Sequence, residues 1–200
     1  MNQNSIWADI KPWKTIESRI VFQADPWLRV VADDVLLPDG RRVDNFLRLE
    51  APDFAAIVPI NEHDEIGLLR SYKHGVGGID LQPPAGYIEP NEDPLAAAKR
   101  ELLEETGCCS QRWKSLGSFV VGGNRGAGHA HLFLATGCRK IAEPNSGDLE
   151  EQDLHWIPRS EVHRRWMQGE FQQLAAIAAL GMALAHLGSN TPTLDQPTTS

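Results

Sequence analysis

The stretch that decides the fold of this chain runs from Gly86 to Cys108 and reads GYIEPNEDPLAAAKRELLEETGC. It places Glu101, Glu104 and Glu105 in the last turns of a predicted helix. Residues three and four apart share a helix face, so the three carboxylates are expected to converge. Acids near the negative end of a helix dipole are disfavoured, and like charges at this spacing repel one another. Mg²⁺ or Mn²⁺, which prefer carboxylate oxygens, would offset this repulsion, and a divalent metal site is therefore predicted.

Local signals define both ends of this helix. Asp93 has the short acceptor side chain of an N-cap residue, and Pro94 suits the first helical position. Gly107 is expected just after the helix, with the positive φ that favours glycine. The apolar residues between these ends recur at helical spacing, so one side of the helix is expected to pack on a sheet.

The rest of the chain predicts strands and a few helices. Pro38-Asp39-Gly40 supplies turn chemistry between two apolar runs, so a hairpin is expected from Val30 to Leu49. A glycine-rich loop is expected over residues 122–128. Further strands are predicted at 55–60, 65–72, 79–82, 113–121, 129–136 and 154–157, and further helices at 160–167 and 171–187. This order predicts a mixed α/β fold of the α+β kind.

Composition narrows the class of protein. The chain has 200 residues, enough for one domain with an added subdomain, and a formal net charge of −8. This charge argues against nucleic acid or an anionic membrane as a partner. Three cysteines, two of them adjacent, form neither a disulfide framework nor a spaced zinc site. The N-terminus lacks the apolar core of a signal peptide, and no apolar run approaches the ~18 residues of a membrane span. A cytoplasmic protein is expected.

The stretch from Gly86 onward fits the pattern G-x5-E-x7-R-E-U-x-E-E-x-G-U, where U is a bulky apolar residue. The fixed positions are Gly86, Glu92, Arg100, Glu101, Leu102, Glu104, Glu105, Gly107 and Cys108. This pattern resembles the Nudix box of the Nudix hydrolases. The resemblance implies a Nudix fold, a mixed β-sheet sandwiched between helices, with the box forming a loop–helix–loop.

Sequence outside the box also resembles one branch of this family. The segments LLPDGRRVDNF, LLRSYKH, PPAG and HLFLAT look like those of the ADP-ribose pyrophosphatase and nucleoside-diphosphate-sugar hydrolase branch. Members of this branch are usually homodimers with a separate N-terminal sheet. The resemblance therefore implies an N-terminal antiparallel β-hairpin subdomain for dimerisation at residues 1–52 and a Nudix hydrolase domain at residues 53–188. The polar residues 189–200 are expected to form a disordered tail.

The match to the box also implies roles for individual residues. Glu101, Glu104 and Glu105 are the expected catalytic metal ligands, together with the backbone carbonyl of Ala85. The expected structural positions within the motif are Gly86, Glu92, Arg100 and Gly107. Arg100 is expected to orient a glutamate through a charge-assisted hydrogen bond.

A general base is often supplied outside the box in this branch, from a loop before the last strand. Here that loop reads GDLEEQD, and Glu151 is favoured over Glu150 and Asp153. The alternative is a solvated acidic loop with no catalytic role.

Substrate contacts are predicted from two other segments. Arg70 and Lys73 lie near the end of a strand that leads toward the box, where they would meet phosphate or nucleotide. Asn124 and Arg125 lie in the glycine-rich loop, whose backbone N–H groups and guanidinium would suit phosphate. The alternatives are a surface pair and an ordinary hairpin loop.

These features predict metal-dependent hydrolysis, with Mg²⁺ or Mn²⁺, of the diphosphate bond of a nucleoside-diphosphate sugar. ADP-ribose is the first choice of substrate and would give AMP and ribose 5-phosphate. Gly123 stands where ADP-ribose-cleaving members tend to carry proline, so GDP-mannose, a dinucleoside polyphosphate or coenzyme A stays open. A non-catalytic nucleotide-sensing domain is the alternative from another class, and the intact set of carboxylates favours catalysis over it.

Overall fold

The computed structural model describes residues 10–147, 149 and 151–189. The chain divides into two compact units. One consists of the described residues up to Pro52 together with Val120–His129, and the other of Asp53–Phe119 together with the described residues from Ala130 onward. The predicted tail lies outside the described residues from position 190, and so does the candidate base Glu150.

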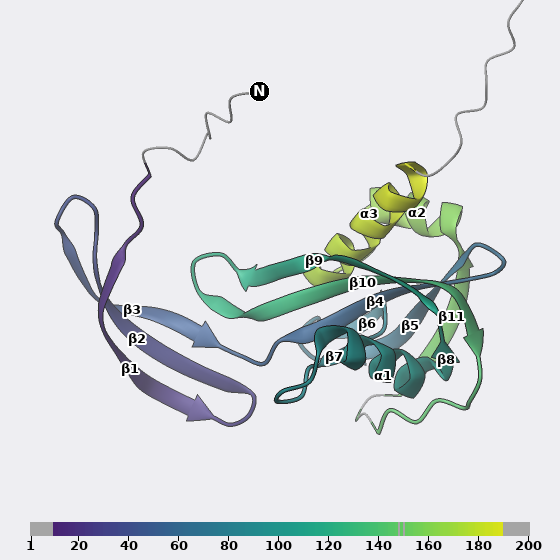
Figure 1. Ribbon diagram of the computed structural model, residues 1–200, viewed down its shortest axis with the longest axis horizontal. Helices are drawn as coiled ribbons and strands as arrows, with labels where there is room; N and C mark the ends of the chain where they lie inside the picture. Colours follow the sequence, from purple (N-terminus) through teal and green to yellow (C-terminus); the bar gives the residue numbers. More distant parts are fainter. Residues whose placement is uncertain (1–9, 148, 150, 190–200) are drawn as a thin grey trace, which may run out of the picture. The chain divides into compact units, whose positions relative to one another are not determined.

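The N-terminal unit is built on a three-stranded antiparallel meander (Figure 1). Its strands are β1 (Lys14–Ala24), β2 (Leu28–Leu36) and β3 (Arg42–Glu50). The predicted hairpin between β2 and β3 is confirmed, and Gly40 in its turn has φ of 87°. Glycine adopts this conformation without the strain that a side chain would add.

Two acidic residues are buried in the central strand of this meander. Asp33 accepts hydrogen bonds from Ser18 Oγ at 2.6 Å and from Arg48 Nε at 2.9 Å. Asp34 accepts one from Arg42 Nη2 at 2.6 Å and one from the backbone N–H of Asn45 at 3.0 Å. Buried charges are tolerated only when they are paired in this way, so these contacts fix which residues of β1 and β3 lie beside β2.

The second unit contains a mixed sheet in which β10, β4, β5 and β11 are successive neighbours. Strand β10 runs parallel to β4, with Ala130 opposite Phe54, whereas the other pairings among these four strands are antiparallel. Further strands extend the sheet: β6 pairs with β5, β7 with β4, and β8 and β9 with β10. The bounds are β4 (Phe54–Asn61), β5 (Glu65–Lys73), β6 (Gly78–Gln82), β7 (Ala85–Tyr87), β8 (Cys108–Cys109), β9 (Arg112–Gly122), β10 (Gly126–Lys140) and β11 (Gln152–Pro158).

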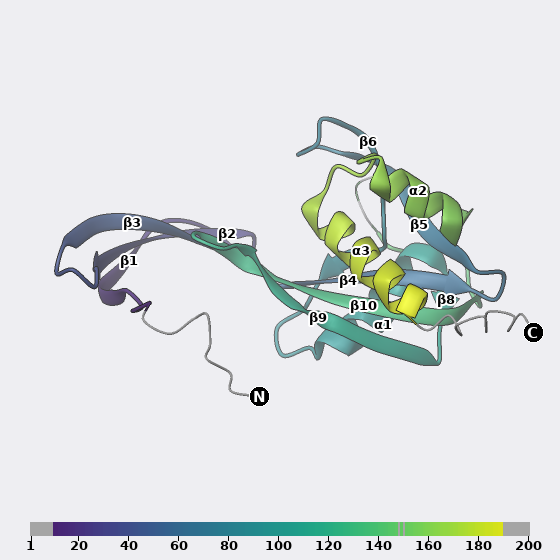
Figure 2. The same ribbon diagram turned by 90° about the horizontal axis from the view of Figure 1, so that it is seen from above.

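Helices cover both faces of this sheet (Figure 2). Helices α2 (Arg159–Met167) and α3 (Leu174–Ser189) pack on one face around a cluster that includes Leu68, Leu132 and Leu180. Helix α1 (Pro94–Thr106) packs on the other face through Ala97, Ala98 and Leu102. The predicted mixed sheet between helices is therefore confirmed. No helix among the described residues is long and apolar enough to span a membrane.

The glycine-rich segment differs from its prediction as a loop, because β10 already begins at Gly126. Gly126 has φ of 83° and pairs in parallel with Leu49 of β3. A Cβ atom at Gly126 would lie 2.7 Å from the carbonyl oxygen of Leu49. The glycine therefore permits a close strand pairing, and that pairing makes residues 126–129 part of the N-terminal unit.

Candidate active site

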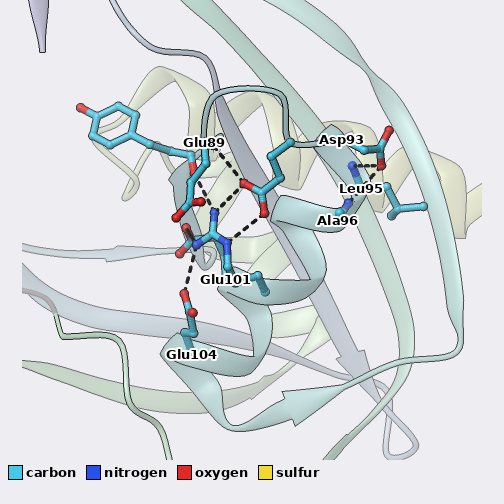
Figure 3. Close-up of polar contacts among 9 residues, drawn as sticks. Glu89, Asp93, Leu95, Ala96, Glu101 and Glu104 are labelled. Carbon is cyan, nitrogen blue, oxygen red and sulfur yellow. Dashed lines mark hydrogen bonds and ion pairs between the residues drawn. The ribbon is translucent and has the colours of Figure 1, made fainter. Parts of the chain in front are cut away.

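Helix α1 carries the three box glutamates, and both of its ends follow the sequence prediction. The side chain of Asp93 accepts hydrogen bonds from the N–H groups of Leu95 at 3.0 Å and Ala96 at 3.1 Å, as Figure 3 shows. Gly107 has φ of 69° and donates its N–H to the carbonyl of Leu103 at 2.8 Å. The N-cap and the left-handed C-terminal glycine are thus confirmed, and they set which helical positions face the sheet.

Strand β7 holds two of the glutamates in place. The backbone N–H of Ala85 donates to Oε2 of Glu105 at 2.8 Å, and Glu105 is only 6% exposed. The carboxyl group of Glu101 lies against Gly86, where a Cβ atom would fall 2.1 Å from the carboxyl carbon. Since no side chain fits there, glycine at position 86 makes the space that Glu101 occupies.

Arg100 links the helix to the loop that precedes it. Its Nη1 donates to Glu101 Oε1 at 2.6 Å and to Glu104 Oε2 at 3.0 Å (Figure 3). Its Nε and Nη2 donate to the two carboxylate oxygens of Glu92 at 3.0 and 2.9 Å, and Nη2 also donates to the carbonyl of Tyr87. One guanidinium therefore holds three carboxylates and one backbone carbonyl.

The electrostatics follow from this arrangement. The hydrogen bond from Arg100 holds the pKa of Glu92 below its usual value. Conversely, the hydrogen bonds to Glu92 and then Glu101, with the nearby charge of Glu101, raise the pKa of Arg100. The pairing is part-buried, with the Glu92 and Glu101 side chains 17% and 12% exposed. Such charge-assisted bonds are stronger than neutral ones, so the cluster is a rigid support for the box carboxylates.

The arrangement modifies the expectation that three carboxylates converge on a metal. Among the described residues, no three His, Cys, Asp or Glu side chains are grouped so that they could hold an ion as they lie. The physical reason is that Arg100 supplies the counter-charge for Glu101 and Glu104. The donors themselves are carboxylate and carbonyl oxygens, the chemistry that Mg²⁺ prefers. By the chemistry of these donors, the residues present fit a hard divalent ion.

The other predicted residues of this unit lie along β5 and β11. Arg70 and Lys73 are on β5, and Arg70 Nη1 lies 3.6 Å from Asp153 Oδ2 on the neighbouring strand β11. Glu151 is exposed and directly precedes β11. Arg70 also lines a cleft of about 200 Å³ between β6 and the segment that precedes α3.

Asn124 and Arg125 lie in the N-terminal unit. Asn124 is exposed at the turn between β9 and β10. Arg125 Nη1 donates to the carbonyl of Leu47 at 2.6 Å, and the guanidinium lies 4.5 Å from the centre of the Phe46 ring. This cation–π contact and hydrogen bond orient Arg125 within its own unit.

Arg100 is a shared partner of three glutamates. The spacing of residues along the sequence predicted only part of this role. Its bond to Glu104 follows from helical i,i+4 spacing. Its bonds to Glu92 and to the carbonyl of Tyr87 depend on how the loop folds back over the helix. The only available signal was the presence of one arginine amid several glutamates.

Comparison with family models identifies two regions. A model described as the NUDIX domain matches residues 51–177. A second, described as the nucleoside diphosphate sugar hydrolase N-terminal domain, matches residues 13–46.

Individual relatives support the same relationship. An ADP-ribose pyrophosphatase of Mycobacterium tuberculosis is 29% identical over 150 residues, covering 74% of this chain and 72% of that protein. A CMP-5'-(N-acetyl-N-hydroxy-3-aminopropyl)phosphonate hydrolase of Streptomyces rubellomurinus is 30% identical over 180 residues, covering 88% and 82%. A crystal structure of an ADP compounds hydrolase shares the fold, with a TM-score of 0.77 and 19% identity over 90% of this chain and 96% of that one.

Proposed function

The chain belongs to the NUDIX family and is a Nudix hydrolase, and we propose that it hydrolyses the diphosphate bond of a nucleoside-diphosphate sugar. ADP-ribose is the first substrate, giving AMP and ribose 5-phosphate. The matched N-terminal domain of nucleoside diphosphate sugar hydrolases and the similarity to an ADP-ribose pyrophosphatase support this choice.

The observation that carries the proposal is the pair of contacts between β7 and α1. Gly86 leaves room for the carboxyl group of Glu101, and the Ala85 N–H fixes Glu105. Both carboxylates are thereby held next to one short backbone segment, which also presents the Ala85 carbonyl. Positioning of this kind is the main requirement of phosphoryl transfer, since the protein contributes little covalent chemistry.

The reaction itself is a displacement by water. The water oxygen forms a bond to one phosphorus atom, the bond between that phosphorus and the bridging oxygen breaks, and the second phosphate leaves with its oxygen. A proton is lost from the water. Glu151 is the proposed acceptor of this proton, and the alternative is that the loop is only solvated and a box glutamate assists.

The proposed cofactor is Mg²⁺ or Mn²⁺, held by Glu101, Glu104, Glu105 and the Ala85 carbonyl. A bound divalent ion would neutralise the phosphate charge and lower the pKa of a water molecule bound to it. Arg100 would have a positioning role, because it hydrogen-bonds Glu101 and Glu104. Glu92 in turn restrains Arg100.

Two segments are proposed to contact the substrate. Arg70 and Lys73 are proposed to meet phosphate or nucleotide from β5, and Asn124 and Arg125 from the turn between β9 and β10. We further propose that the protein is a cytoplasmic homodimer joined through its N-terminal sheet. In support, strand β1 exposes several large apolar side chains, among them Ile16, Ile20 and Phe22.

One relative favours a second substrate class. The Streptomyces protein, which matches the larger share of this chain, acts according to its name on a CMP-linked phosphonate. A cytidine derivative would present the same reacting group, a phosphorus anhydride next to a nucleoside. The second candidate is therefore hydrolysis of a CMP-linked compound by the same residues.

The test is to incubate the purified full chain with ADP-ribose and Mg²⁺ and to follow the products by phosphorus NMR. AMP and ribose 5-phosphate are expected, and EDTA should stop their formation. Glu105→Gln should reduce the rate at least about 100-fold while the fold is retained, since it removes an anionic ligand of the proposed metal ion, whose charge would neutralise the reacting phosphates. Glu143→Gln, a change of an exposed glutamate on the loop after β10, is the matched control and should leave the rate unchanged.

The other outcomes are equally informative. If CMP-linked substrates are cleaved and ADP-ribose is not, the second candidate is correct. If nucleotides bind but none is cleaved with Mg²⁺ or Mn²⁺, the domain is a nucleotide sensor and the proposed hydrolysis is wrong.

A further inference from the structure

Two arginines of this chain differ from all the others that the structure describes. The chain has 13 arginines, and within the described residues 11 of them direct the guanidinium to a carboxylate or carbonyl oxygen. The two exceptions in that part of the chain are Arg112 and Arg139, whose guanidinium groups make no hydrogen bond or ion pair. In a chain with a net charge of −8, unpaired guanidiniums are unexpected.

These two arginines line the same cleft. It has a volume of about 230 Å³ and lies between β8, the start of β9 and the end of β10. Arg112 enters from β9 and Arg139 from β10. Two positive charges in one small cleft repel each other, and an anion between them would offset this repulsion.

The cleft has a defined floor. Ser110 Oγ donates to the carbonyl of Thr136 at 2.7 Å and accepts from the N–H of Arg112 at 3.0 Å. Gly137, with φ of 68°, lies beneath the guanidinium of Arg112, and a Cβ there would fall 2.6 Å from Arg112 Nη2. The glycine therefore makes the space that this guanidinium occupies.

A third cation extends the cleft along the same face of the sheet. Trp113 packs with the cluster beneath α1, whereas Leu116 packs with the cluster beneath α3. Alternate residues of a strand point to opposite faces, so Arg112 and Lys114 lie on the α3 side, away from the box helix. Lys114 lines an adjoining hollow of about 470 Å³ that shares Arg112 with the first.

We propose that Arg112 and Arg139 form a second anion site, which binds the phosphate group of a phosphorylated small molecule. The planar fork of arginine matches phosphate oxygens with paired, charge-assisted hydrogen bonds. Lys114 adds charge on the side where the rest of the molecule would extend. The site is separate from the box glutamates, and its binding requires no turnover.

The first test is a titration of the full-length, ¹⁵N-labelled protein with inorganic phosphate and then with AMP, followed by NMR. The amide resonance of Gly137 and the side-chain Nε–H resonance of Arg112 should shift along one saturable curve. The double variant Arg112→Gln with Arg139→Gln should weaken binding about tenfold or more, because two charge-assisted contacts are lost. Arg139→Gln alone, which breaks no hydrogen bond or ion pair of the guanidinium with the described residues, should give part of this loss if the double variant is unstable.

Two controls separate this site from general charge effects and from catalysis. Arg41→Gln makes the same change of charge at an exposed turn of the N-terminal unit and should leave phosphate binding unchanged. Glu105→Gln should reduce hydrolysis at least about 100-fold and leave the phosphate titration of the Gly137 amide unchanged. Failure of the proposed function therefore does not affect this test.

Three results would overturn the proposal. The first is phosphate binding by the double variant that equals binding by the unchanged protein. The second is an equal loss of binding in Arg41→Gln. The third is a shift of Gly137 by succinate as large as the shift by phosphate at equal concentration. The last result would assign the cleft to carboxylates instead.

Discussion

The carboxyl group of Glu101 occupies the volume in which a side chain at Gly86 would begin. A Cβ atom at position 86 would lie 2.1 Å from the carboxyl carbon and 2.2 Å from each carboxylate oxygen. Real atoms do not approach so closely, so either the strand or the glutamate must move. Gly86→Ala is therefore expected to displace Glu101 and to lower kcat about 100-fold, the usual effect of a misplacement of about 1 Å.

Hydrolysis rates and thermal unfolding measured together check this prediction. Gly75→Ala is the matched control, because a Cβ there meets nothing within 4 Å. The control should retain full activity, and both variants should fold. An active Gly86→Ala protein would mean that Glu101 has no part in the reaction.

Arg100 is expected to act through the glutamates and not on the substrate. Arg100→Gln removes the shared partner of Glu92, Glu101 and Glu104, so kcat should fall about 10- to 100-fold, as for other residues that orient ligands. The KM for substrate should change by less than about threefold, since uniform binding is not affected. Steady-state kinetics at saturating Mg²⁺ separate the two parameters. A large rise in KM with kcat retained would instead place Arg100 in contact with the substrate.

The N-terminal meander should become less stable in acid. The hydrogen bond from Arg48, and a smaller one from Ser18, hold the pKa of Asp33 below its usual value of 3.8. A carboxyl group with a lowered folded-state pKa stabilises the fold above its unfolded pKa and loses that contribution as pH falls through the folded value. Stability should therefore hold down to about pH 4 and fall below it.

Asp33→Ala tests this contribution directly. The variant leaves Arg48 and Ser18 without their shared acceptor and should lower Tm by about 5 °C at pH 7. Asp44→Ala, which removes an exposed carboxylate from the same meander, should change Tm by no more than about 1 °C. Equal effects of the two variants would show that burial of Asp33 is unimportant.

The cysteines should differ in reactivity. Burial raises the pKa of Cys138 to about 12 and also raises the pKa of Cys108. Thiolate is the reactive form, so neither should react with a disulfide reagent such as DTNB at pH 8 in the folded protein. Cys109, which is only partly buried, should supply the accessible thiol.

Counting the thiols before and after denaturation checks this expectation. All three cysteines should react in the unfolded chain, and Cys109→Ser should abolish the reaction of the folded one. Fast reaction in folded Cys109→Ser protein would contradict the burial of the other two.

Local features of the box could be read from sequence because they depend on neighbours along the chain. Asp93 caps α1 through N–H groups two and three residues ahead, and Gly107 ends it through a bond to Leu103. Turn chemistry likewise defined the hairpin between β2 and β3. These contacts form wherever the local residues favour them.

Contacts across the fold could not be read in the same way. Gly126 pairs with Leu49, and Gly137 receives the guanidinium of Arg112, because distant strands meet there. In each case the only sign in the sequence is a glycine, and a glycine is as typical of a loop as of a close contact between strands. Helix α3 gives a smaller example: the predicted start at Phe171 was wrong, since α3 begins at Leu174 and Phe171 is buried ahead of it.

The parallel pairing of β10 with β4 has a consequence for synthesis on the ribosome. Ala130 must reach Phe54 before the sheet of the second unit can close, and Gly126 must reach Leu49 in the first. Neither unit can be completed while the chain is shorter than this point, because both use part of β10. Such long-range pairings fold slowly. The nascent chain should therefore remain protease-sensitive until well after the box helix has emerged. The second unit should become resistant last, because its core also needs Leu180 of α3.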